Sequence, residues 1–181
     1  MKFKYKIQQY QTAAADAVCN AFEGQPNQAA ALYTRDLGRV PHSRTGDEPM
    51  IAYSFGREEG YANAPVRLTR TVILDNVRRV QRANQLSEST ELYNGMGFCQ
   101  LDVEMETGTG KTYVYTKTMF ELNRRYGWCK FIVVVPSVAI REGVHQSLRD
   151  TEQHFFEQYG KAIRYFVYDS NRLNDLDAYS Q

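Results

Sequence analysis

The stretch Met105–Thr112 is the part of the chain whose residue types and spacing could do chemistry. It reads Met-Glu-Thr-Gly-Thr-Gly-Lys-Thr, which fits the phosphate-binding loop pattern except that Met105 replaces the leading glycine. Gly108 and Gly110 permit backbone conformations in which successive N–H groups point at phosphate oxygens, and a helix starting near Lys111 directs its positive dipole end at the same anion. The predicted phosphate contacts are Thr107, Gly108, Thr109, Gly110, Lys111 and Thr112.

Two residues at the end of this loop carry the expected chemistry. Lys111 would reach the β- and γ-phosphates, and Thr112 would place its hydroxyl on Mg²⁺, so both are predicted catalytic residues and Thr112 is the predicted metal ligand. The alternative is a plain glycine turn between a strand and a helix, with Lys111 solvated. The predicted strand–loop–helix context favours the phosphate site over that alternative.

Hydrolysis needs more than a phosphate loop. Enzymes of this kind also use a Mg²⁺-binding Asp on a later strand, usually followed by a Glu that orients water. The only Asp-Glu pair is Asp47-Glu48, which precedes the loop and does not follow an apolar strand. Glu104 and Glu106 are expected to be a strand and a loop residue without a catalytic role. The sequence therefore predicts nucleotide binding without the second half of a hydrolytic site.

The elements that position the loop follow from the apolar pattern of the second half of the chain. Apolar runs alternate with helical periodicity, which predicts a β-α-β-α-β order, with the strands parallel and ligands at their carboxyl ends. The expected fold class is α/β, with an incomplete parallel sheet flanked by helices. The predicted strands are 98–105, 131–135 and 163–168, and the predicted helices are 111–126 and 137–159.

The first half of the chain is less regular. Ala14, Ala17, Val18, Ala21 and Phe22 form one apolar stripe, which predicts a helix over 12–22 that ends before Gly24. Gly, Pro and Asn then predict a long loop or insertion over 25–63, with one short strand near 50–55. A further helix is expected within 66–86.

Arginine is concentrated between Arg35 and Asn84, where nine arginines occur without a lysine. They could contact phosphates, or they could form a solvated face that is balanced by the six acids of the same span. The second alternative is the more common one.

Composition excludes several classes of protein. The chain has 181 residues, 43% of them hydrophobic, and a net charge of +1, which predicts one globular core and no bulk electrostatic hold on nucleic acid. Cys19, Cys99 and Cys129 lack disulfide or zinc spacing. There is no signal-peptide core and no apolar run of membrane-spanning length. A cytoplasmic protein without membrane contact is expected.

With these residues in view, the sequence resembles the restriction (Res) subunit of type III restriction endonucleases, within the superfamily-two helicases and translocases. The similarity covers nearly the whole chain and is weakest over 25–97. The phosphate loop alone would indicate only the superfamily. Two other stretches point to this family: Glu-Leu-Asn to Tyr-Gly-Trp (Glu121–Trp128) and Pro-Ser to Arg-Glu-Gly-Val (Pro136–Val144). The matching stretches are Tyr10–Gln25, Glu104–Tyr115, Phe120–Asn123, Tyr126–Trp128 and Val133–Val144.

The resemblance implies roles for four residues outside the phosphate loop. Gln11 matches the glutamine that reads adenine, so ATP with Mg²⁺ is the implied cofactor; a glutamine at a helix start is otherwise often just exposed. Pro136, Ser137 and Arg141 match a helicase motif that touches the nucleic-acid backbone. For Ser137 the alternative, a plain helix N-cap, is equally open.

The resemblance also implies partners and an organisation that this chain does not complete. Family members act on double-stranded DNA with a modification methyltransferase (Mod) subunit, and they carry a second RecA-like domain and a nuclease domain. The chain is therefore expected to be an N-terminal, ATP-binding piece of such an enzyme, inactive alone. Its expected segments are 1–24 with the adenine-reading Gln11, the insertion 25–97, and 98–181 as the first part of a RecA-like domain.

Two other functions are alternatives to this one. A self-standing P-loop phosphotransferase would need a lid and an acceptor site, for which the sequence leaves little room. A non-catalytic interaction module would bind the methyltransferase subunit or DNA through its insertion.

Overall fold

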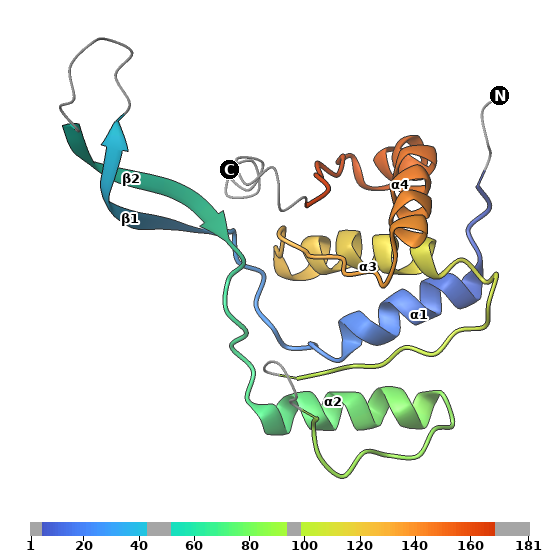
Figure 1. The fold of residues 1–181 in the computed structure, drawn as a ribbon. Coiled ribbons are helices and arrows are strands. Elements are labelled where there is room, and N and C mark those ends of the chain that lie inside the picture. Colours follow the sequence, from blue (N-terminus) through green and yellow to red (C-terminus); the bar gives the residue numbers. More distant parts are fainter. Residues whose placement is uncertain (1–4, 43–51, 94–98, 169–181) are drawn as a thin grey trace.

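A computed structural model of the chain describes residues 5–42, 52–93 and 99–168 (Figure 1). Within these residues four helices and one antiparallel strand pair form, and a long extended segment leads into the third helix. The elements in chain order are α1 (Gln9–Asn20), β1 (Ala31–His42), β2 (Ala52–Ala62), α2 (Arg70–Ala83), α3 (Lys111–Tyr126) and α4 (Val138–Tyr159).

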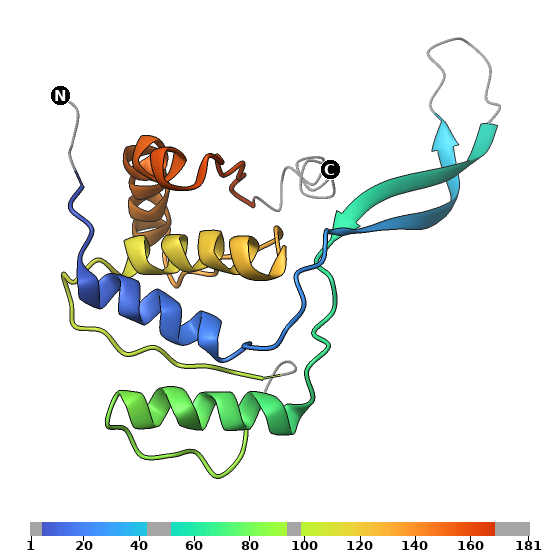
Figure 2. The same ribbon diagram turned by 180° about the vertical axis from the view of Figure 1, so that it is seen from behind.

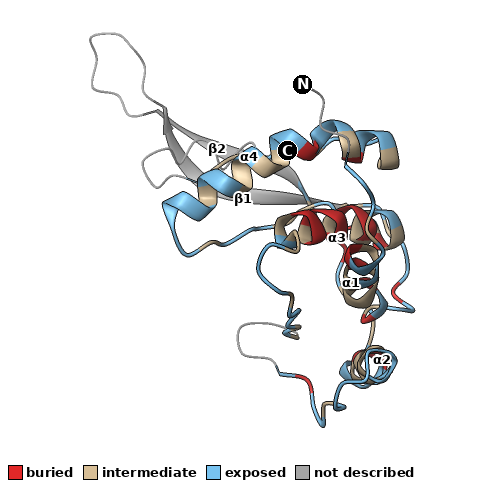
Figure 3. Ribbon diagram, turned by 90° about the vertical axis from the view of Figure 1, so that its right-hand side faces the viewer, coloured by how far each residue is buried: buried red, intermediate tan, exposed pale blue. Residues whose placement is uncertain are grey.

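Helix α3 is the centre of the fold, and α1 packs along it. Figure 3 shows the buried residues concentrated on α3 and on the neighbouring part of α1. The most buried positions of α1 are Gln11, Ala15 and Cys19, one turn apart, so the face turned to the core is offset from the predicted stripe that begins at Ala14. Burial raises the pKa of the Cys19 thiol to about 12.

The carboxyl end of α3 closes this core. Tyr126 and Trp128 pack with Cys19, while the Tyr126 hydroxyl donates to the Cys19 carbonyl at 2.8 Å and the Trp128 indole donates to the Ala64 carbonyl at 3.0 Å. Gly127, with φ +79°, turns the chain between the two rings, and a Cβ there would lie 2.1 Å from the Gln28 carbonyl oxygen. The Tyr-Gly-Trp stretch therefore has a structural role.

Helix α4 packs across α3 through stacked aromatic rings. Phe155 lies between Tyr113 and Phe120, with ring centroids 5.0 Å from each, and Tyr159 stacks on Phe120 at 4.8 Å. The Tyr113 hydroxyl also bonds His154 Nε2 at 2.8 Å. These contacts join the first three turns of α3 to the second half of α4.

Helix α2 is tied to the end of α1 by buried amides. The Asn76 amide donates to the carbonyls of Ala21 and Glu23 at 3.2 and 2.9 Å, and Gln25 bonds the backbone of Pro65 and Arg67. Although these residues are distant in sequence, they bind the segment before α2 to the turn after α1.

The arginines of α2 are engaged within the fold. Arg79 pairs with Glu23 at 2.9 Å and Arg82 with Glu88 at 3.0 Å, while Arg78 donates to the carbonyls of Ser89 and Thr90. For these three arginines the contacts favour a structural role over phosphate binding, although Glu23 and Glu88 lie outside the span whose acids were expected to balance them.

The pairing of β1 with β2 differs from the expected loop with one short strand. The strands form a long antiparallel hairpin in which Arg35 pairs with Glu58 and Asp36 with Arg57, before an irregularity between Asp36 and Arg39. The hairpin projects from the helices (Figures 1 and 2) and packs against no other element within the described residues.

The expected parallel sheet does not form within the described residues. The three predicted strands, of which 99–105 (the described part of the first), 131–135 and 163–168 are described, form no regular secondary structure and pair with no strand. In Figures 1 and 2 the segment 99–106 runs between α1 and α2, whereas the chain after α3 returns along α3, so α1 separates the two. A parallel sheet needs helices on both faces, and here α1 and α3 pack on each other instead. The apolar side chains of Ile132 and Val134 consequently stay 79% and 87% exposed.

The predicted helices agree well with the observed ones. The bounds 111–126 and 137–159 are confirmed, the latter with Ser137 as the N-cap, and α1 begins three residues before the predicted start. None of the helices in the described ranges combines the length and apolar character that crossing a membrane requires.

Candidate nucleotide-binding site

The loop before α3 is shaped by two glycines in left-handed conformations. Gly108 has φ +82° and Gly110 has φ +86°, and Gly110 is the N-cap of α3. A Cβ at Gly108 would meet no atom within 4 Å, whereas a Cβ at Gly110 would lie 2.6 Å from Gln11 Nε2. The backbone dictates glycine at both positions, and the neighbouring α1 adds a second constraint at Gly110 alone.

The N–H groups at the start of α3 are open. The first hydrogen bond of the helix runs from the Val114 N–H to the Gly110 carbonyl at 3.0 Å. Within the described residues, the N–H groups of Gly110, Lys111 and Thr112 donate to no acceptor. Together with the positive end of the helix dipole, three such donors at one helix start can bind an anion.

The carbonyl of Glu106 organises the opposite side of the loop. It accepts the Thr109 hydroxyl at 2.6 Å, the Lys111 ammonium at 3.1 Å and the Thr109 N–H at 3.4 Å. Lys111 and Thr107 are exposed, while Thr109 and Thr112 are half-buried. The Lys111 ammonium thus folds back over the loop and bonds its carbonyl. It can replace this hydrogen bond with one to a phosphate oxygen.

Helix α1 brings two side chains to the loop from almost a hundred residues away. Gln11 Nε2 donates to the Thr109 carbonyl at 3.0 Å, and the Tyr10 hydroxyl donates to the same oxygen at 3.1 Å. Gln11 is 9% exposed, so it is not the solvated glutamine of the alternative reading. The structure therefore joins Gln11 to the phosphate loop.

Thr112 is the loop residue that the sequence predicts to hold a metal ion. Its half-buried side chain stands in the first turn of α3, and within the described residues no group of three or more His, Cys, Asp or Glu side chains could hold a metal. Mg²⁺ keeps several waters and is often held by one protein oxygen plus substrate phosphates. A single threonine hydroxyl therefore fits Mg²⁺ only when phosphate oxygens and waters supply the other ligands.

The three predicted DNA contacts lie together at the start of α4. The Ser137 hydroxyl accepts the Ile140 N–H at 3.3 Å and so caps the helix, and Arg141 pairs with Glu142 at 3.2 Å. Pro136 and Ser137 are exposed. A capping hydroxyl retains its own O–H donor, so both readings of Ser137 stay compatible with this geometry. No hydrogen bond within the described residues joins these three residues to the phosphate loop.

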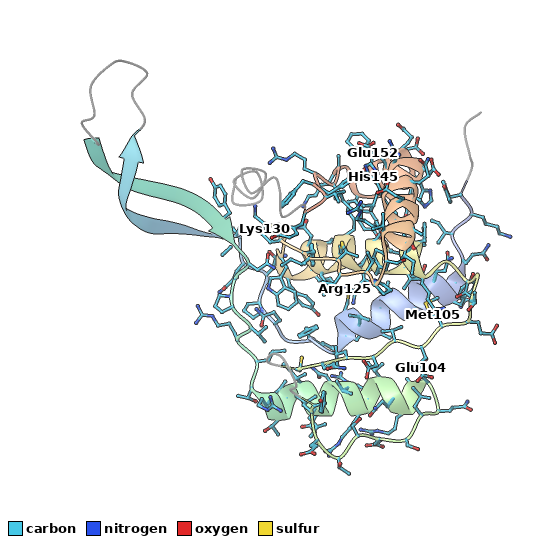
Figure 4. All side chains as sticks on the ribbon, viewed as in Figure 1. Glu104, Met105, Arg125, Lys130, His145 and Glu152 are labelled. Atoms are coloured by element: carbon cyan, nitrogen blue, oxygen red, sulfur yellow. The ribbon has the colours of Figure 1, made fainter. Side chains whose placement is uncertain are left out.

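The remaining acidic residues near the loop are exposed. Glu104 lies on the segment between α1 and α2 (Figure 4), where it is exposed and belongs to no strand, contrary to the expectation. Asp102 and Glu106 are exposed as well. The pair Asp47-Glu48 lies outside the described residues.

Two contributors to the site were not predicted from the sequence. Tyr10 shares the Thr109 carbonyl with Gln11, and Lys117 reaches from α3 to the Thr12 hydroxyl at 3.0 Å. The only sequence signal for Tyr10 is its position next to Gln11, because its partner is 99 residues away.

Comparison with known proteins shows which family this sequence belongs to. The family model described as "Type III restriction enzyme, res subunit" matches residues 4–175. The EcoPI Res subunit of Escherichia phage P1, a type III restriction-modification enzyme, is 38% identical over 144 residues, covering 74% of this chain and 15% of that relative.

Two further type III Res subunits are similar over shorter stretches. The EcoP15I Res subunit of Escherichia coli is 36% identical over 113 residues, covering 61% of this chain and 12% of the relative. The StyLTI Res subunit of Salmonella typhimurium is 52% identical over 61 residues, covering 33% and 6%. The chain thus spans only a small part of the length of these relatives. Because the family model covers nearly all of it, the chain belongs to the Res subunit family of type III restriction enzymes.

Proposed function

We propose that this chain is the ATP-binding part of the DNA-translocating motor of a type III restriction endonuclease. In this proposal the loop Thr107–Thr112 cradles the phosphates of ATP, Lys111 bonds the β- and γ-phosphates, and Gln11 reads adenine. Thr112 would be the chain's own ligand to Mg²⁺, which supplies positive charge at the phosphates when bound.

One observation carries this proposal: the open N–H groups of Gly110, Lys111 and Thr112 lie together at a helix start, beside Lys111 and within one residue of the carbonyl that Gln11 holds. A phosphate group needs several donors and positive charge at one point. Every helix start has unpaired N–H groups, but a plain glycine turn would not require a buried glutamine bonded to it.

The whole enzyme's activity follows from the relatives and is proposed on that ground. The matched relatives are restriction-modification enzymes, so we propose that the complete protein cleaves double-stranded DNA together with a modification methyltransferase. Pro136, Ser137 and Arg141 would touch the DNA backbone. Hydrolysis would depend on further groups, because the described acidic residues near the loop, Asp102, Glu104 and Glu106, are all exposed.

The test is a calorimetric titration of the chain with ATP–Mg²⁺. Replacing Lys111 with Ala removes a charge-assisted contact to phosphate, so we expect a loss of about tenfold or more in affinity, down to undetectable binding. Lys161→Ala is the matched control, since it removes one exposed lysine charge whose ammonium bonds Asn123. Asn123 is twelve residues along α3 from Lys111, on the order of 18 Å.

The control separates a site effect from a general effect of charge. Lys161→Ala should bind ATP–Mg²⁺ within about twofold of the unchanged chain, because an exposed contact contributes little. Equal affinity of the Lys111→Ala chain and the unchanged chain would remove Lys111 from the site. Circular dichroism of each chain establishes beforehand that the helices are formed.

A second candidate function, a non-catalytic interaction module, has one observation in its favour. The hairpin β1–β2 projects from the helices and packs against no other described element, and an isolated two-stranded hairpin is marginally stable in water. The test is the affinity of the methyltransferase subunit for the Lys111→Ala chain. If that chain no longer binds ATP but binds the methyltransferase subunit as tightly as the unchanged chain does, this candidate is favoured.

A further inference from the structure

The carbonyl oxygen of Thr109 is held by two side chains of α1 at once. The Tyr10 hydroxyl donates to it at 3.1 Å and Gln11 Nε2 at 3.0 Å. A carbonyl oxygen has two lone pairs, so the pair of donors fills its acceptor capacity. The orientation of this one peptide group is therefore set from outside the loop, by a helix 98 and 99 residues earlier in the chain.

Holding this carbonyl also aims an N–H group of the phosphate site. The Thr109–Gly110 peptide is trans and planar, like every described peptide bond, so its C=O and the N–H of Gly110 point in opposite directions. With the carbonyl directed to α1, the Gly110 N–H is directed away from α1. That N–H is one of the three open donors at the start of α3.

This peptide needs an external anchor because its neighbours are permissive. Gly108 and Gly110 both have positive φ, and glycine passes between positive and negative φ at little cost. A flip of the peptide would turn a carbonyl oxygen toward the phosphate oxygens in place of a donor. Two hydrogen bonds to the carbonyl oppose that flip.

The anchor is itself held rigidly. Lys117 of α3 donates to the Thr12 hydroxyl at 3.0 Å. This hydrogen bond fixes the first turn of α1 on α3, the helix that follows the loop. The short distance from a Gly110 Cβ to Gln11 Nε2 also puts α1 directly against the loop. Tyr10 and the loop therefore belong to one packed unit.

The two donors differ in what else they can do. Gln11 is buried and has an assigned part in the proposed function, the adenine edge. Tyr10 is 50% exposed and has no other hydrogen bond from its hydroxyl within the described residues. We propose that Tyr10 is a positioning residue of the phosphate site: its hydroxyl holds the Thr109 carbonyl toward α1, so that the Gly110 N–H faces the phosphates whatever the base. This inference rests on the proposed function.

The test replaces Tyr10 with Phe, which removes only the hydroxyl, and compares three probes by calorimetry: ATP–Mg²⁺, inorganic tripolyphosphate and adenosine. Loss of one hydrogen bond to the loop should weaken ATP–Mg²⁺ and tripolyphosphate by the same factor, roughly 3- to 10-fold. Adenosine affinity should stay unchanged, because the base contact belongs to Gln11. Tyr93→Phe is the matched control: its ring is 66% exposed and its hydroxyl makes no hydrogen bond within the described residues.

A second measurement needs no ligand. The ¹H–¹⁵N heteronuclear NOE of the Gly110 amide in the nucleotide-free chain should fall in Tyr10→Phe and stay constant in Tyr93→Phe, because the peptide has lost one of its anchors. An unchanged NOE, together with unchanged tripolyphosphate affinity, would overturn the role of Tyr10. Equal weakening of adenosine would also overturn it, since the damage would then extend to α1 as a whole.

The outcome separates this inference from the proposed function. If Lys111→Ala loses ATP–Mg²⁺ while Tyr10→Phe binds it like the unchanged chain, the inference fails and the proposed function stands. If the unchanged chain binds neither ATP–Mg²⁺ nor tripolyphosphate, the proposed function fails and the assignment of Tyr10 to a phosphate site fails with it.

Discussion

Gly108 and Gly110 share a backbone conformation but not their surroundings. Both have φ near +85°, which costs an L-residue about 1 kcal/mol or more. Only Gly110 also has a neighbour, Gln11 Nε2, at a distance that no Cβ tolerates. Since that neighbour is the end of a flexible side chain, a methyl group at Gly110 would displace Gln11 and break its bond to Thr109.

The two glycines therefore give a prediction about base recognition. Gly108→Ala and Gly110→Ala should both weaken ATP–Mg²⁺, because each strains the loop. Gly110→Ala should in addition reduce the preference for ATP over GTP by roughly three- to tenfold, since one hydrogen bond that orients Gln11 is lost. The measurement is the ratio of the two affinities in each chain. The same ratio in both variants would contradict the assignment of Gln11 to adenine.

At the scale of the elements, the two ends of α3 have different roles: the amino end forms the phosphate site and the carboxyl end holds α4. Its amino end supplies the open N–H groups, Lys111 and Thr112. Toward its carboxyl end, the buried Glu121 accepts hydrogen bonds from Arg124, Arg125 and Tyr159, and so joins α3 to α4. The family-specific Glu-Leu-Asn and Tyr-Gly-Trp stretches thus hold the helix that presents the phosphate site.

This network predicts a pH-dependent loss of stability in Glu121→Gln. Burial alone would raise the pKa of the Glu121 carboxyl, but the hydrogen bonds from Arg124 and Tyr159 outweigh it and the pKa is lowered. At neutral pH the variant leaves two arginines without their carboxylate, which should lower the unfolding free energy by about 1–3 kcal/mol. This range lies below the cost of breaking a fully buried ion pair, because Arg124 is mostly exposed to solvent. Urea unfolding measures this cost.

The sign of the pH effect follows from the lowered pKa. A carboxyl whose folded-state pKa lies below its unfolded value contributes its full stabilisation above the unfolded value of 4.5 and loses it as the pH falls further. The gap between the unchanged chain and Glu121→Gln should therefore be constant near neutral pH and shrink below pH 4.5. Glu142→Gln, at an exposed pair with Arg141, should cost less than about 0.5 kcal/mol. A gap that persists unchanged at pH 3 would contradict the assignment.

For the molecule as a whole, local signals predicted the helices and the loop, while long-range pairing could not be predicted. Helix α3 was predicted from end to end because Gly110 and Gly127 flank it, and both adopt positive φ at its two ends. Ser137, an N-cap with an extended backbone, and Gly160, with φ +65°, delimit α4.

The errors concern contacts between distant segments. The apolar run 131–135 predicts a strand, but strand pairing depends on a neighbour that periodicity does not identify, and here the run stays unpaired. The hairpin β1–β2 was missed because Gly38 and Pro41 interrupt β1 and Gly56 and Gly60 interrupt β2. The buried position of Gln11 and the contact of Tyr10 depend on packing across almost a hundred residues.

The claim that the N–H groups of the loop hold phosphate can be tested amide by amide. In a ¹⁵N-labelled chain titrated with ATP–Mg²⁺, the largest amide proton shifts should occur at Gly110, Lys111 and Thr112, because these donors gain an anionic acceptor. The amides of Thr71 and Val72 in the first turn of α2, a helix start that Thr69 already caps, should move little. Shifts that concentrate at the start of α2 or α4, or shifts that leave the amides of the loop unmoved while ATP binds, would contradict the account.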